Sequence, residues 1–494
     1  MTPQSGATSG LMLREGTIFE RSTPERKGFQ LSFPDVPRLK PTTFSRTESA
    51  ELPEVAELQV VRHFTRLSSW NYAIDLGTFP LGSCTMKYNP RINEEMAALA
   101  GFCDVHPELP PPFCQGSLRL IFQLERALSE IVGLDACTLQ PAAGALGEFT
   151  GLTMVRAFHE KHGSHRKYVL VPESAHGTNP ASCILAGYQA ITIKVGPEGY
   201  MTTASVEEAI SKYGRDIAAL MTTNPNTLGV FEQNISHIAE LLHGIGAQLI
   251  MDGANMNAIL GIAKPGDMGV DVMQYNLHKT FSTPHGGGGP GAGPVACRSH
   301  LIPFLPNPRI VHKAGIYDVE YLPDSIGKVK GAFGNFGVMV RALTYIMNHG
   351  SQGLRTVSKN AVINANYLRA QLQKKYQLGT STPHFHECVL SDSRQIQQNG
   401  TKTLQIAKAL MDYGYHPPTV YFPLTVPGAM LIEPTETESL QELDQLAEAF
   451  LEIAARIENK EDTFENAPTK TFVGKVDEVG AARKLILSVD DRPR

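Results

Sequence analysis

The 494-residue sequence lacks the signatures of membrane, secreted and nucleic-acid-binding proteins. It contains no run of about 18 apolar residues, so we expect no transmembrane helix. The N-terminus has no apolar segment like that of a secretory signal, and Glu15, Glu20 and Glu25 argue against an acid-poor transit peptide. No basic block is present and the formal net charge is −5, which disfavours nucleic-acid binding. We therefore expect a cytoplasmic protein that binds neither membrane nor nucleic acid.

Cysteine is sparse, and its arrangement excludes two further classes. The number of cysteines is odd, and none of them forms a C-x-x-C pair. A disulfide framework and a structural zinc site are therefore not expected, and we expect no bound metal. The seven cysteines are Cys84, Cys103, Cys114, Cys137, Cys183, Cys297 and Cys388.

Length and composition bound the domain organisation. A chain of this length suits about two or three domains, and 42% hydrophobic with 19% charged residues is typical of a globular protein. Residues 1–60 are rich in Pro, Ser, Thr and charge; they predict an extended arm that wraps a neighbour or the body, with a partly disordered tail as the alternative. We predict a large α/β domain over 61–339. Long helical segments from 340 onward predict a smaller α+β domain over 340–494.

Short apolar stretches alternate with helical patterns between residues 117 and 300. Apolar spacing predicts helices over 118–133, 148–163 and 235–246, with Gly133 capping the first. Ser205 and Glu208 fit a capping box that would begin a further helix. This alternation predicts a mainly parallel sheet covered on both faces. The expected strands are 168–172, 190–195, 217–223, 247–252, 271–276 and 293–298.

The segment 252–294 carries the main chemical signal. Lys279 follows the predicted strand 271–276, and open parallel sheets bind ligands beyond the carboxyl ends of their strands. A lysine that forms an imine must be partly desolvated so that its amine can lose a proton near neutral pH. An isolated lysine is normally a solvated surface charge. Apolar neighbours favour the covalent role here, and they are Val272, Met273, Leu277 and Phe281.

Two polar residues at other strand ends complement this lysine. Asp252 closes a predicted strand, and a carboxylate there could keep the nitrogen of a pyridine cofactor protonated. The alternative for Asp252 is a helix cap or turn residue. His176 follows the strand 168–172 and could stack on the cofactor ring, whereas the alternative is a hydrogen-bonded loop histidine.

Small residues near these positions predict a phosphate site. Ala142, Ala143, Gly144 and Ala145 lead into a predicted helix, whose free N–H groups favour a phosphate dianion. An ordinary tight loop is the alternative. The run from Gly286 to Gly289 fits neither a phosphate loop nor a dinucleotide fingerprint, so a close backbone approach to a ligand and a flexible loop both remain open.

Long motifs in this sequence resemble a known family, the P-protein of the glycine cleavage system, which is glycine dehydrogenase (decarboxylating). The resemblance covers roughly residues 60 to 475. It is carried by DGANMNAILGIAKPGDMGVDVMQYNLHKTFSTPHGGGGPGAGP (252–294), PLGSCTMKYNPR (80–91), LQPAAGALGEFTGL (139–152), SAHGTNPAS (174–182), TNPNTLGVFE (223–232), GNFGVMVRA (334–342), DYGYHPPTVYFPLTVP (412–427) and IEPTETES (432–439).

The resemblance implies a fold-type I enzyme dependent on pyridoxal 5′-phosphate (PLP), with residue roles that follow the family's motifs. Lys279 would be the Schiff-base lysine, Asp252 the partner of the ring nitrogen and His176 the ring-stacking residue. Ala254 would pack against the ring. The cofactor contacts would be completed by Gly144 and Ala145 at the phosphate and by His278 beside the lysine.

The chain length resembles that of the PLP-bearing subunit in organisms that split the P-protein into two. The resemblance implies decarboxylation of glycine and transfer of the aminomethyl group to the lipoyl arm of H-protein. It also implies a first P-protein subunit as partner, with two copies of each in a heterotetramer. The family pattern is not matched at Leu146, where relatives have His, or over 67–82. Ser83, Thr85 and Asn89 are candidates for holding the glycine carboxylate.

Other functions remain open at this point. One is a different fold-type I PLP enzyme, such as an amino-acid decarboxylase or a cysteine desulfurase, although no cysteine has an obvious activating context. Another is a non-catalytic structural subunit, against which the presence of both Lys279 and Asp252 argues. A nicotinamide enzyme is disfavoured because no G-x-G-x-x-G opens a βαβ unit.

Overall fold

The computed structural model describes residues 15–29, 32–33, 35–37, 42–48, 50–286 and 291–488. Gly287 to Gly289 of the glycine run lie outside these residues. Internal contacts divide the chain into two units: residues 77–469, and residues 1–76 together with 470–494.

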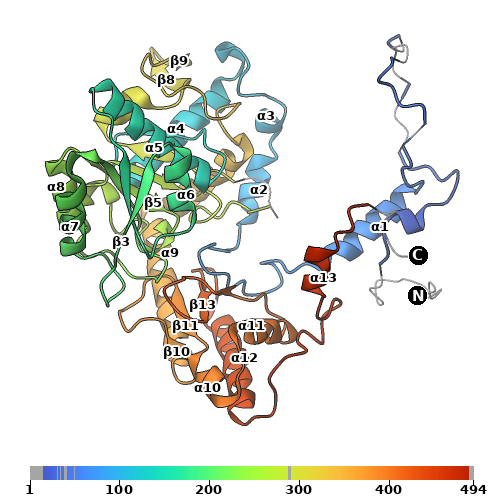
Figure 1. The fold of residues 1–494 in the computed structure, drawn as a ribbon. Coiled ribbons are helices and arrows are strands. Elements are labelled where there is room, and N and C mark those ends of the chain that lie inside the picture. The colour runs from blue at the N-terminus through green and yellow to red at the C-terminus, as the bar shows by residue number, and fades with distance from the viewer. Residues whose placement is uncertain are drawn as a thin grey trace. The chain divides into compact units, whose positions relative to one another are not determined.

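A seven-stranded sheet forms the centre of the larger unit (Figure 1). Its strands are β1 (Ala136–Thr138), β2 (Tyr168–Pro172), β3 (Gln189–Ile193), β4 (Ile217–Thr223), β5 (Gln248–Gly253), β6 (Val272–Tyr275) and β7 (Val295–Cys297). They lie in the order β1-β7-β6-β5-β4-β2-β3. The pairs from β6 to β3 are parallel, whereas β7 runs antiparallel to both β1 and β6. The predicted α/β class with a mainly parallel sheet is confirmed.

Helices cover both faces of this sheet because its central strands are apolar on both sides. In β5, Leu249 and Met251 belong to one core and Ile250 belongs to another. In β6, Met273 and Val272 divide in the same way. Each strand is therefore buried on both faces, as expected for parallel strands joined through helices. The connecting helices are α4 (Gln115–Val132), α5 (Gly144–Lys161), α6 (Thr178–Leu185), α7 (Thr203–Tyr213) and α8 (Ile235–Gly244).

The helix ends test two predictions of capping. Gly133 ends α4 in the left-handed conformation, with φ of 71°, so the predicted glycine cap is confirmed. The predicted capping box of Ser205 and Glu208 is wrong. Helix α7 begins earlier, and Thr202 is its N-cap because the Thr202 side chain accepts a hydrogen bond from Ser205 N. Ser205 thus lies inside the first turn as the donor.

Several short elements of this unit lie outside the seven-stranded sheet and its connecting helices. The β8–β9 hairpin pairs antiparallel over Arg309–Lys313 and Ile316–Glu320. Two short helices, α2 (Arg91–Ala97) and α3 (Ala100–Cys103), precede α4. The 3-10 turns among the described residues of this unit are η2 (Pro111–Phe113), η3 (Gly214–Asp216), η4 (Met256–Ala258), η5 (Pro265–Met268) and η6 (Ser299–Phe304).

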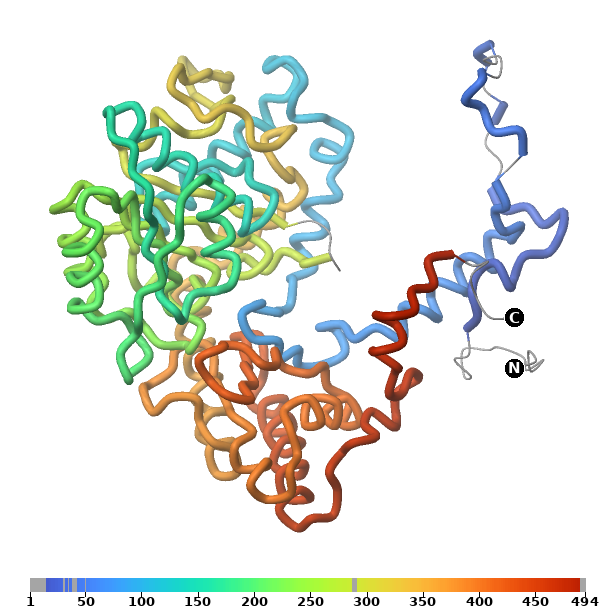
Figure 2. The backbone as a smooth tube through the Cα atoms, viewed as in Figure 1, coloured from blue at the N-terminus to red at the C-terminus, as the bar shows by residue number. Residues whose placement is uncertain are grey.

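A second, smaller sheet follows in the same unit. It is antiparallel, with the order β10-β11-β13-β12. Figures 1 and 2 show this sheet with its helices below the large sheet, joined to it by the long helix α9 (Phe336–Leu372). The chain kinks inside α9 at Gly350, whose φ of 58° and ψ of −178° only glycine adopts readily. The remaining elements are β10 (Gln377–Leu378), β11 (Cys388–Ser391), α10 (Ser393–Asn399), α11 (Thr403–Asp412), β12 (Thr419–Val420), β13 (Ala429–Ile432) and α12 (Leu440–Glu458).

The other unit contains η1 (Phe19–Arg21), α1 (Glu57–Ser68) and α13 (Glu478–Arg483). A buried carboxylate organises it: Glu15 Oε2 accepts from Arg66 Nη1 at 3.1 Å, and Glu15 Oε1 lies 2.7 Å from His63 Nδ1. The two chain segments of the unit meet where Trp70 stacks on Phe472 with ring centroids 5.9 Å apart. The domain limits at 60 and 339 stay predictions, and α9 runs through the second of them.

Among the residues that the structure describes, no helix has both the length and the apolar character needed to cross a membrane.

Candidate active site

The residues predicted for the site lie at one edge of the large sheet. Asp252 is near the end of β5, and Lys279 follows β6, the strand next to it. His176 follows β2, which is separated from β5 only by β4. Because these strands are parallel, their carboxyl ends meet at the same edge. The fold therefore gathers residues that are far apart in the sequence.

Asp252 is a buried carboxylate with an unusually complete set of donors. Its Oδ2 accepts from Asn179 Nδ2 at 3.2 Å and from Thr223 Oγ1 at 3.1 Å. Its Oδ1 accepts from Ala254 N at 3.0 Å and from Gln274 Nε2. These four hydrogen bonds hold the carboxylate in one orientation and compensate for the loss of water around it.

The Thr223 hydroxyl has a second acceptor within reach, Asn179 Oδ1 at 3.4 Å. A hydroxyl carries one hydrogen, so Thr223 donates either to Asp252 or to Asn179. Rotation of that hydrogen towards Asn179 frees a lone pair on Asp252 Oδ2. The carboxylate can thus accept an N–H from a bound ring without any change in its own position.

His176 is half-buried and lies edge-on to Phe422, with ring centroids 5.5 Å apart. Thr178 N donates to His176 Nδ1 at 3.2 Å, which places the ring proton on Nε2. Burial lowers the pKa of His176, the charge of Lys279 lowers it further, and Asp252 opposes both effects. A neutral imidazole suits contact with an aromatic ring.

The structure adds a residue that sequence reasoning missed, Glu148 on α5. It is buried, and its Oε1 accepts from Thr178 Oγ1 at 2.9 Å, while Thr178 Oγ1 lies 2.8 Å from His176 Nδ1. Ser182 Oγ donates to the other oxygen of Glu148 at 2.8 Å. Burial and then the charge of Asp252 raise the pKa of Glu148 to about 7. One chain of hydrogen bonds therefore joins Glu148 to His176.

Lys279 lies in a turn directly after β6. Its backbone N–H donates to Asn276 O at 3.3 Å, and its carbonyl accepts from Ser282 N at 3.1 Å. The preceding His278 accepts from Ala292 N at 3.2 Å, and burial lowers the pKa of His278 to about 3. His278 is thus neutral and faces the segment that follows the glycine run.

The residues fit the phosphate and the ring of PLP. The N-cap of α5, Ala143, makes no side-chain cap, so the first-turn N–H groups at Gly144 and Ala145 have no side-chain acceptor from it. The segment after the glycine run passes close to this turn, since a Cβ on Gly293 would lie 2.2 Å from Ala143 O. Ala254, beside Asp252, is half-buried. Several buried polar atoms around the lysine also lack a protein partner among the described residues, and they are Gln274 Oε1, Asn276 Oδ1, Thr280 Oγ1 and Thr283 Oγ1.

The PLGSCTMKYNP segment (80–90) lies near this site, and several of its polar groups are hydrogen-bonded to glutamates of the protein. Thr85 N and Oγ1 donate to Glu433 at 2.9 and 2.5 Å, and Ser83 N donates to Glu387 Oε1 at 2.6 Å. Asn89 Nδ2 donates to Glu94 Oε1 at 2.7 Å. Thr85 and Asn89 are therefore already hydrogen-bonded. The acidic residues that hold this segment, Glu387 and Glu433, were not found from the sequence.

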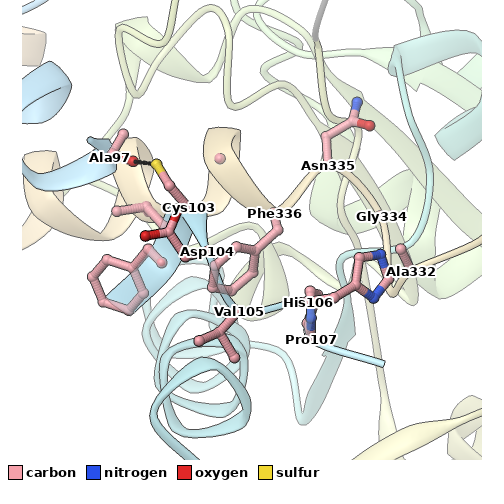
Figure 3. Close-up of a pocket in the computed structure, with 13 residues that line it drawn as sticks. Ala97, Cys103, Asp104, Val105, His106, Pro107, Ala332, Gly334, Asn335 and Phe336 are labelled. Carbon is pink, nitrogen blue, oxygen red and sulfur yellow. Dashed lines mark hydrogen bonds between the residues drawn. The ribbon is translucent and has the colours of Figure 1, made fainter. Parts of the chain in front are cut away.

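A separate cavity of about 530 Å³ lies between the α2–α3 region and the start of α9 (Figure 3). Its wall is mostly apolar and includes Phe102, Val105 and Phe336. Figure 3 shows the hydrogen bond from Cys103 Sγ to Ala97 O, which is 3.0 Å long. Asn335, also in the wall, donates to Gly291 O and so connects this cavity to the segment beside His278.

Comparison with known proteins relates nearly all of the chain to one family. Residues 35–314 match the family described as glycine cleavage system P-protein, and residues 357–472 match the C-terminal domain of glycine dehydrogenase. A "probable glycine dehydrogenase (decarboxylating) subunit 2" of Halalkalibacterium halodurans is 52% identical over 480 residues, which are 96% of this chain and 98% of the relative. A relative of the same description from Chlorobium chlorochromatii is 51% identical over 481 residues, 96% of this chain and 99% of its own.

Solved structures agree on the fold. An inhibitor-bound glycine decarboxylase (P-protein) of the glycine cleavage system superposes with a TM-score of 0.71 at 21% identity, over 83% of this chain and 92% of that one. A cysteine desulfurase from Escherichia coli gives a TM-score of 0.59 at 11% identity, over 79% of this chain and 97% of the other. The predicted fold class, that of fold-type I PLP enzymes, is confirmed. With the family matches and the two relatives, these findings show that the chain belongs to the glycine cleavage system P-protein family.

Proposed function

We propose that this chain is the PLP-bearing subunit of a glycine dehydrogenase (decarboxylating), and that Lys279 binds the cofactor covalently. The observation that carries the proposal is the position of Asp252 and Lys279 at the ends of adjacent parallel strands. The uncapped start of α5 and the neutral His176 support it. PLP, when bound, supplies a sink for the electron pair of the bond that loses CO2.

The residues of the chain orient and tune that chemistry. Asp252, with its fixed carboxylate, would accept a hydrogen bond from the protonated ring nitrogen, and its negative charge would keep that nitrogen protonated. His176 contacts the ring face, and Ala254 packs beside it. Gly144 and Ala145 present N–H groups to the phosphate, while His278 positions the loop that carries Lys279. The buried surroundings exclude water from the reacting carbon.

The proposed acceptor of the aminomethyl group is the lipoyl disulfide of H-protein. The carbon that loses CO2 keeps the bonding electron pair and forms a bond to one sulfur, and the S–S bond breaks. The other sulfur leaves as a thiolate and takes a proton, so the disulfide is reduced without a nicotinamide. We further propose a first P-protein subunit as partner, with two copies of each, in the cytoplasm.

The cysteine desulfurase alternative is disfavoured by Cys84, a thiol on which the charge of Lys279 acts. A desulfurase needs a cysteine that ionises readily. Burial raises the pKa of the Cys84 thiol to about 11, although the positive charge of Lys279 acts in the opposite direction. Such a thiol is almost entirely protonated near neutral pH, so it is a poor nucleophile.

The test is a borohydride reduction of purified protein followed by peptide mapping. The expected result is a reduced cofactor adduct on Lys279 and a visible absorption band that reduction removes. Lys279→Ala should fold normally and lack both. An adduct on another lysine, or a band that survives in Lys279→Ala, would contradict the assignment.

A further inference from the structure

One histidine and two glutamates meet in the interior at the ends of two neighbouring strands of the smaller sheet. His386 and Glu387 directly precede β11, and Glu433 directly follows β13. The antiparallel register pairs Cys388 with Ile432, which brings these strand ends together. One potential ligand atom from each of the three side chains lies within 4.8 Å of the other two. His386 Nε2 is 3.7 Å from Glu387 Oε1 and 4.0 Å from Glu433 Oε1.

The cluster contains buried polar atoms that have no partner. His386 and Glu387 are fully buried, and Glu433 is 1% exposed. Among the described residues, neither ring nitrogen of His386 has a hydrogen-bond partner, and Glu387 Oε2 has none either. Buried polar atoms are nearly always hydrogen-bonded, so an unpartnered imidazole beside two carboxyl groups indicates a missing ligand. The imidazole can offer the lone pair of Nε2 to a cation while its hydrogen stays on Nδ1.

The two carboxyl groups also lack a positive partner in contact with them. In the described part of the chain, no lysine or arginine forms an ion pair with Glu387 or Glu433. Lys87 acts on Glu433 through its charge, but its ion pair is with Glu436 at 2.8 Å. Lys279 likewise acts on both carboxyl groups through its charge alone. Buried carboxylates are normally paired or bound to a metal, and a divalent cation would bring two carboxylates and a neutral imidazole to a net charge of zero.

Hydrogen bonds from the turn 83–85 hold both carboxyl groups in place. Ser83 N donates to Glu387 Oε1 at 2.6 Å. Thr85 N donates to Glu433 Oε2 at 2.9 Å, and Thr85 Oγ1 donates to Glu433 Oε1 at 2.5 Å. A carboxylate oxygen has two lone pairs, so these contacts leave room for a cation. Carboxylates that bind metal ions are commonly fixed by such outer hydrogen bonds.

We propose that His386, Glu387 and Glu433 bind a divalent transition-metal ion, which fixes the turn 83–85 to the ends of β11 and β13. One imidazole nitrogen with carboxylate oxygens suits Zn²⁺, Fe²⁺ or Mn²⁺. Around a tetrahedral Zn²⁺ with bonds of about 2.0–2.2 Å, ligand atoms lie about 3.3–3.6 Å apart. The two separations from His386 Nε2 therefore need to shorten by only a few tenths of an ångström.

This proposal does not depend on the role of Lys279 in the proposed function. The sequence led us to expect no metal because its cysteines lack the spacing of a zinc site, and the cluster contains no cysteine. His386 and Glu387 are adjacent in the sequence, but Glu433 joins them only through the pairing of β11 with β13.

The test measures Zn²⁺ binding to full-length protein that carries no polyhistidine tag. The protein is stripped with a chelator and titrated against a chromophoric competitor. We expect one ion per chain, together with a rise in the temperature of thermal unfolding, because the folded state binds the ion. X-ray absorption at the zinc edge should show one imidazole nitrogen and carboxylate oxygens at about 2.0–2.2 Å.

Three variants test the assignment of the ligands. Glu387→Gln and Glu433→Gln keep an oxygen that accepts from the turn but lose the negative charge, so Zn²⁺ affinity should fall by at least about 10²-fold. Thr85→Val removes the hydroxyl that donates to Glu433 and keeps both carboxylates. It should weaken binding less, by about 10–100-fold.

The matched control is Glu232→Gln, a fully buried carboxyl whose oxygens accept from Met201 N at 2.8 Å and from Asn226 Nδ2 at 2.9 Å. It should bind Zn²⁺ as wild type does. A wild-type protein that takes up no stoichiometric ion would overturn the proposal and show that protons neutralise the carboxyl groups. Unchanged affinity in Glu387→Gln would also overturn it, as would a Zn–S distance of about 2.3 Å, which places the ion on a cysteine. Should the glutamine variants fail to fold, the wild-type titration and absorption spectrum still decide.

Discussion

Lys87 Nζ lies 2.8 Å from Glu436 Oε1 in the protein interior, where the lysine side chain is fully buried. Asn257 Oδ1 accepts a second hydrogen bond from Lys87 Nζ at 2.8 Å. Burial lowers the pKa of Lys87, and Glu436 opposes that effect. The pair connects the PLGSCTMKYNP and IEPTETES motifs, which are about 350 residues apart in the sequence.

We expect Lys87→Met to lower the free energy of unfolding by roughly 3–5 kcal/mol, because it leaves the Glu436 carboxylate buried without its cation. Urea denaturation at neutral pH measures the change. The double variant Lys87→Met/Glu436→Gln should recover part of the loss. Equal losses in the single and double variants would show that the charge pair is not the cause.

Asp252→Asn should preserve the fold and slow decarboxylation by about 10²–10³-fold. The amide can still bond to Ala254 N through its oxygen, but it carries no charge to keep the ring nitrogen protonated. Steady-state release of CO2, measured with saturating cofactor, gives the effect. Thr223→Val is the matched control, because it removes one donor to Asp252 and leaves the charge. Near-normal turnover in Asp252→Asn with bound cofactor would refute the role.

The chain of hydrogen bonds from Glu148 to His176 predicts that the hydrogen bonding at His176 Nδ1 changes with pH. With Glu148 protonated, its O–H donates to Thr178, and Thr178 donates to His176 Nδ1. With Glu148 ionised, the Thr178 hydrogen turns to the carboxylate. We expect the ¹⁵N resonance of His176 Nδ1 to shift near pH 7, in accord with the raised pKa of Glu148. Glu148→Gln should abolish that shift, and Thr178→Ser should retain it.

His176→Ala should weaken PLP binding, since an aromatic contact contributes about 0.5–1.5 kcal/mol.

The raised pKa of Glu148 also makes the free energy of unfolding depend on pH. The folded protein holds a proton on Glu148 up to about pH 7, whereas the unfolded chain releases it near 4.5. Between these values the folded state binds more protons, so this residue's contribution to the free energy of unfolding falls as pH rises. Denaturation of Glu148→Gln from pH 5 to 8 should therefore show a gain relative to wild type that grows with pH. A constant difference would contradict the raised pKa.

The strands that bear the site could be predicted because each is a short, mainly apolar run. Asp252 lies near the end of one such run and Lys279 follows another, and the strands 168–172 and 217–223 have the bounds that the sequence predicts. Because these strands are parallel, their carboxyl ends lie at the same edge of the sheet, and the sequence pattern alone is enough to predict this. The antiparallel β7 was expected as a strand, but its direction depends on a connection that has no local sequence signal.

Glu148, Glu387 and Glu433 could not be identified in the same way. Each is an acidic residue in an ordinary local context, and its significance comes from burial against partners distant in the sequence. Ser83 meets Glu387 from 304 residues away, and Thr85 meets Glu433 from 348. The capping box failed for a related reason: Ser205 and Glu208 have suitable spacing, but Thr202 precedes them and caps α7 first.

The described part of the unit formed by 1–76 and 470–494 exposes large apolar side chains, with Phe33 at 87% and Phe44 at 97% of full exposure. On α1, Leu58, Val61 and Phe64 are exposed as well. An apolar surface of this kind is typical of a protein–protein interface. We expect it to bind the first P-protein subunit, so that the chain alone holds PLP and decarboxylates glycine poorly.

Release of labelled CO2 from the glycine carboxyl group, with each component omitted in turn, tests this expectation. Addition of the first subunit and lipoylated H-protein should restore full activity. The same mixture with Lys279→Ala should stay inactive, because the first subunit is expected to lack the cofactor lysine. A variant with Leu58, Val61 and Phe64 changed to Ser should bind PLP normally and fail to assemble, since the apolar surface drives association. Full activity from this chain with H-protein alone would show that the first subunit is not needed and that the exposed surface has another use.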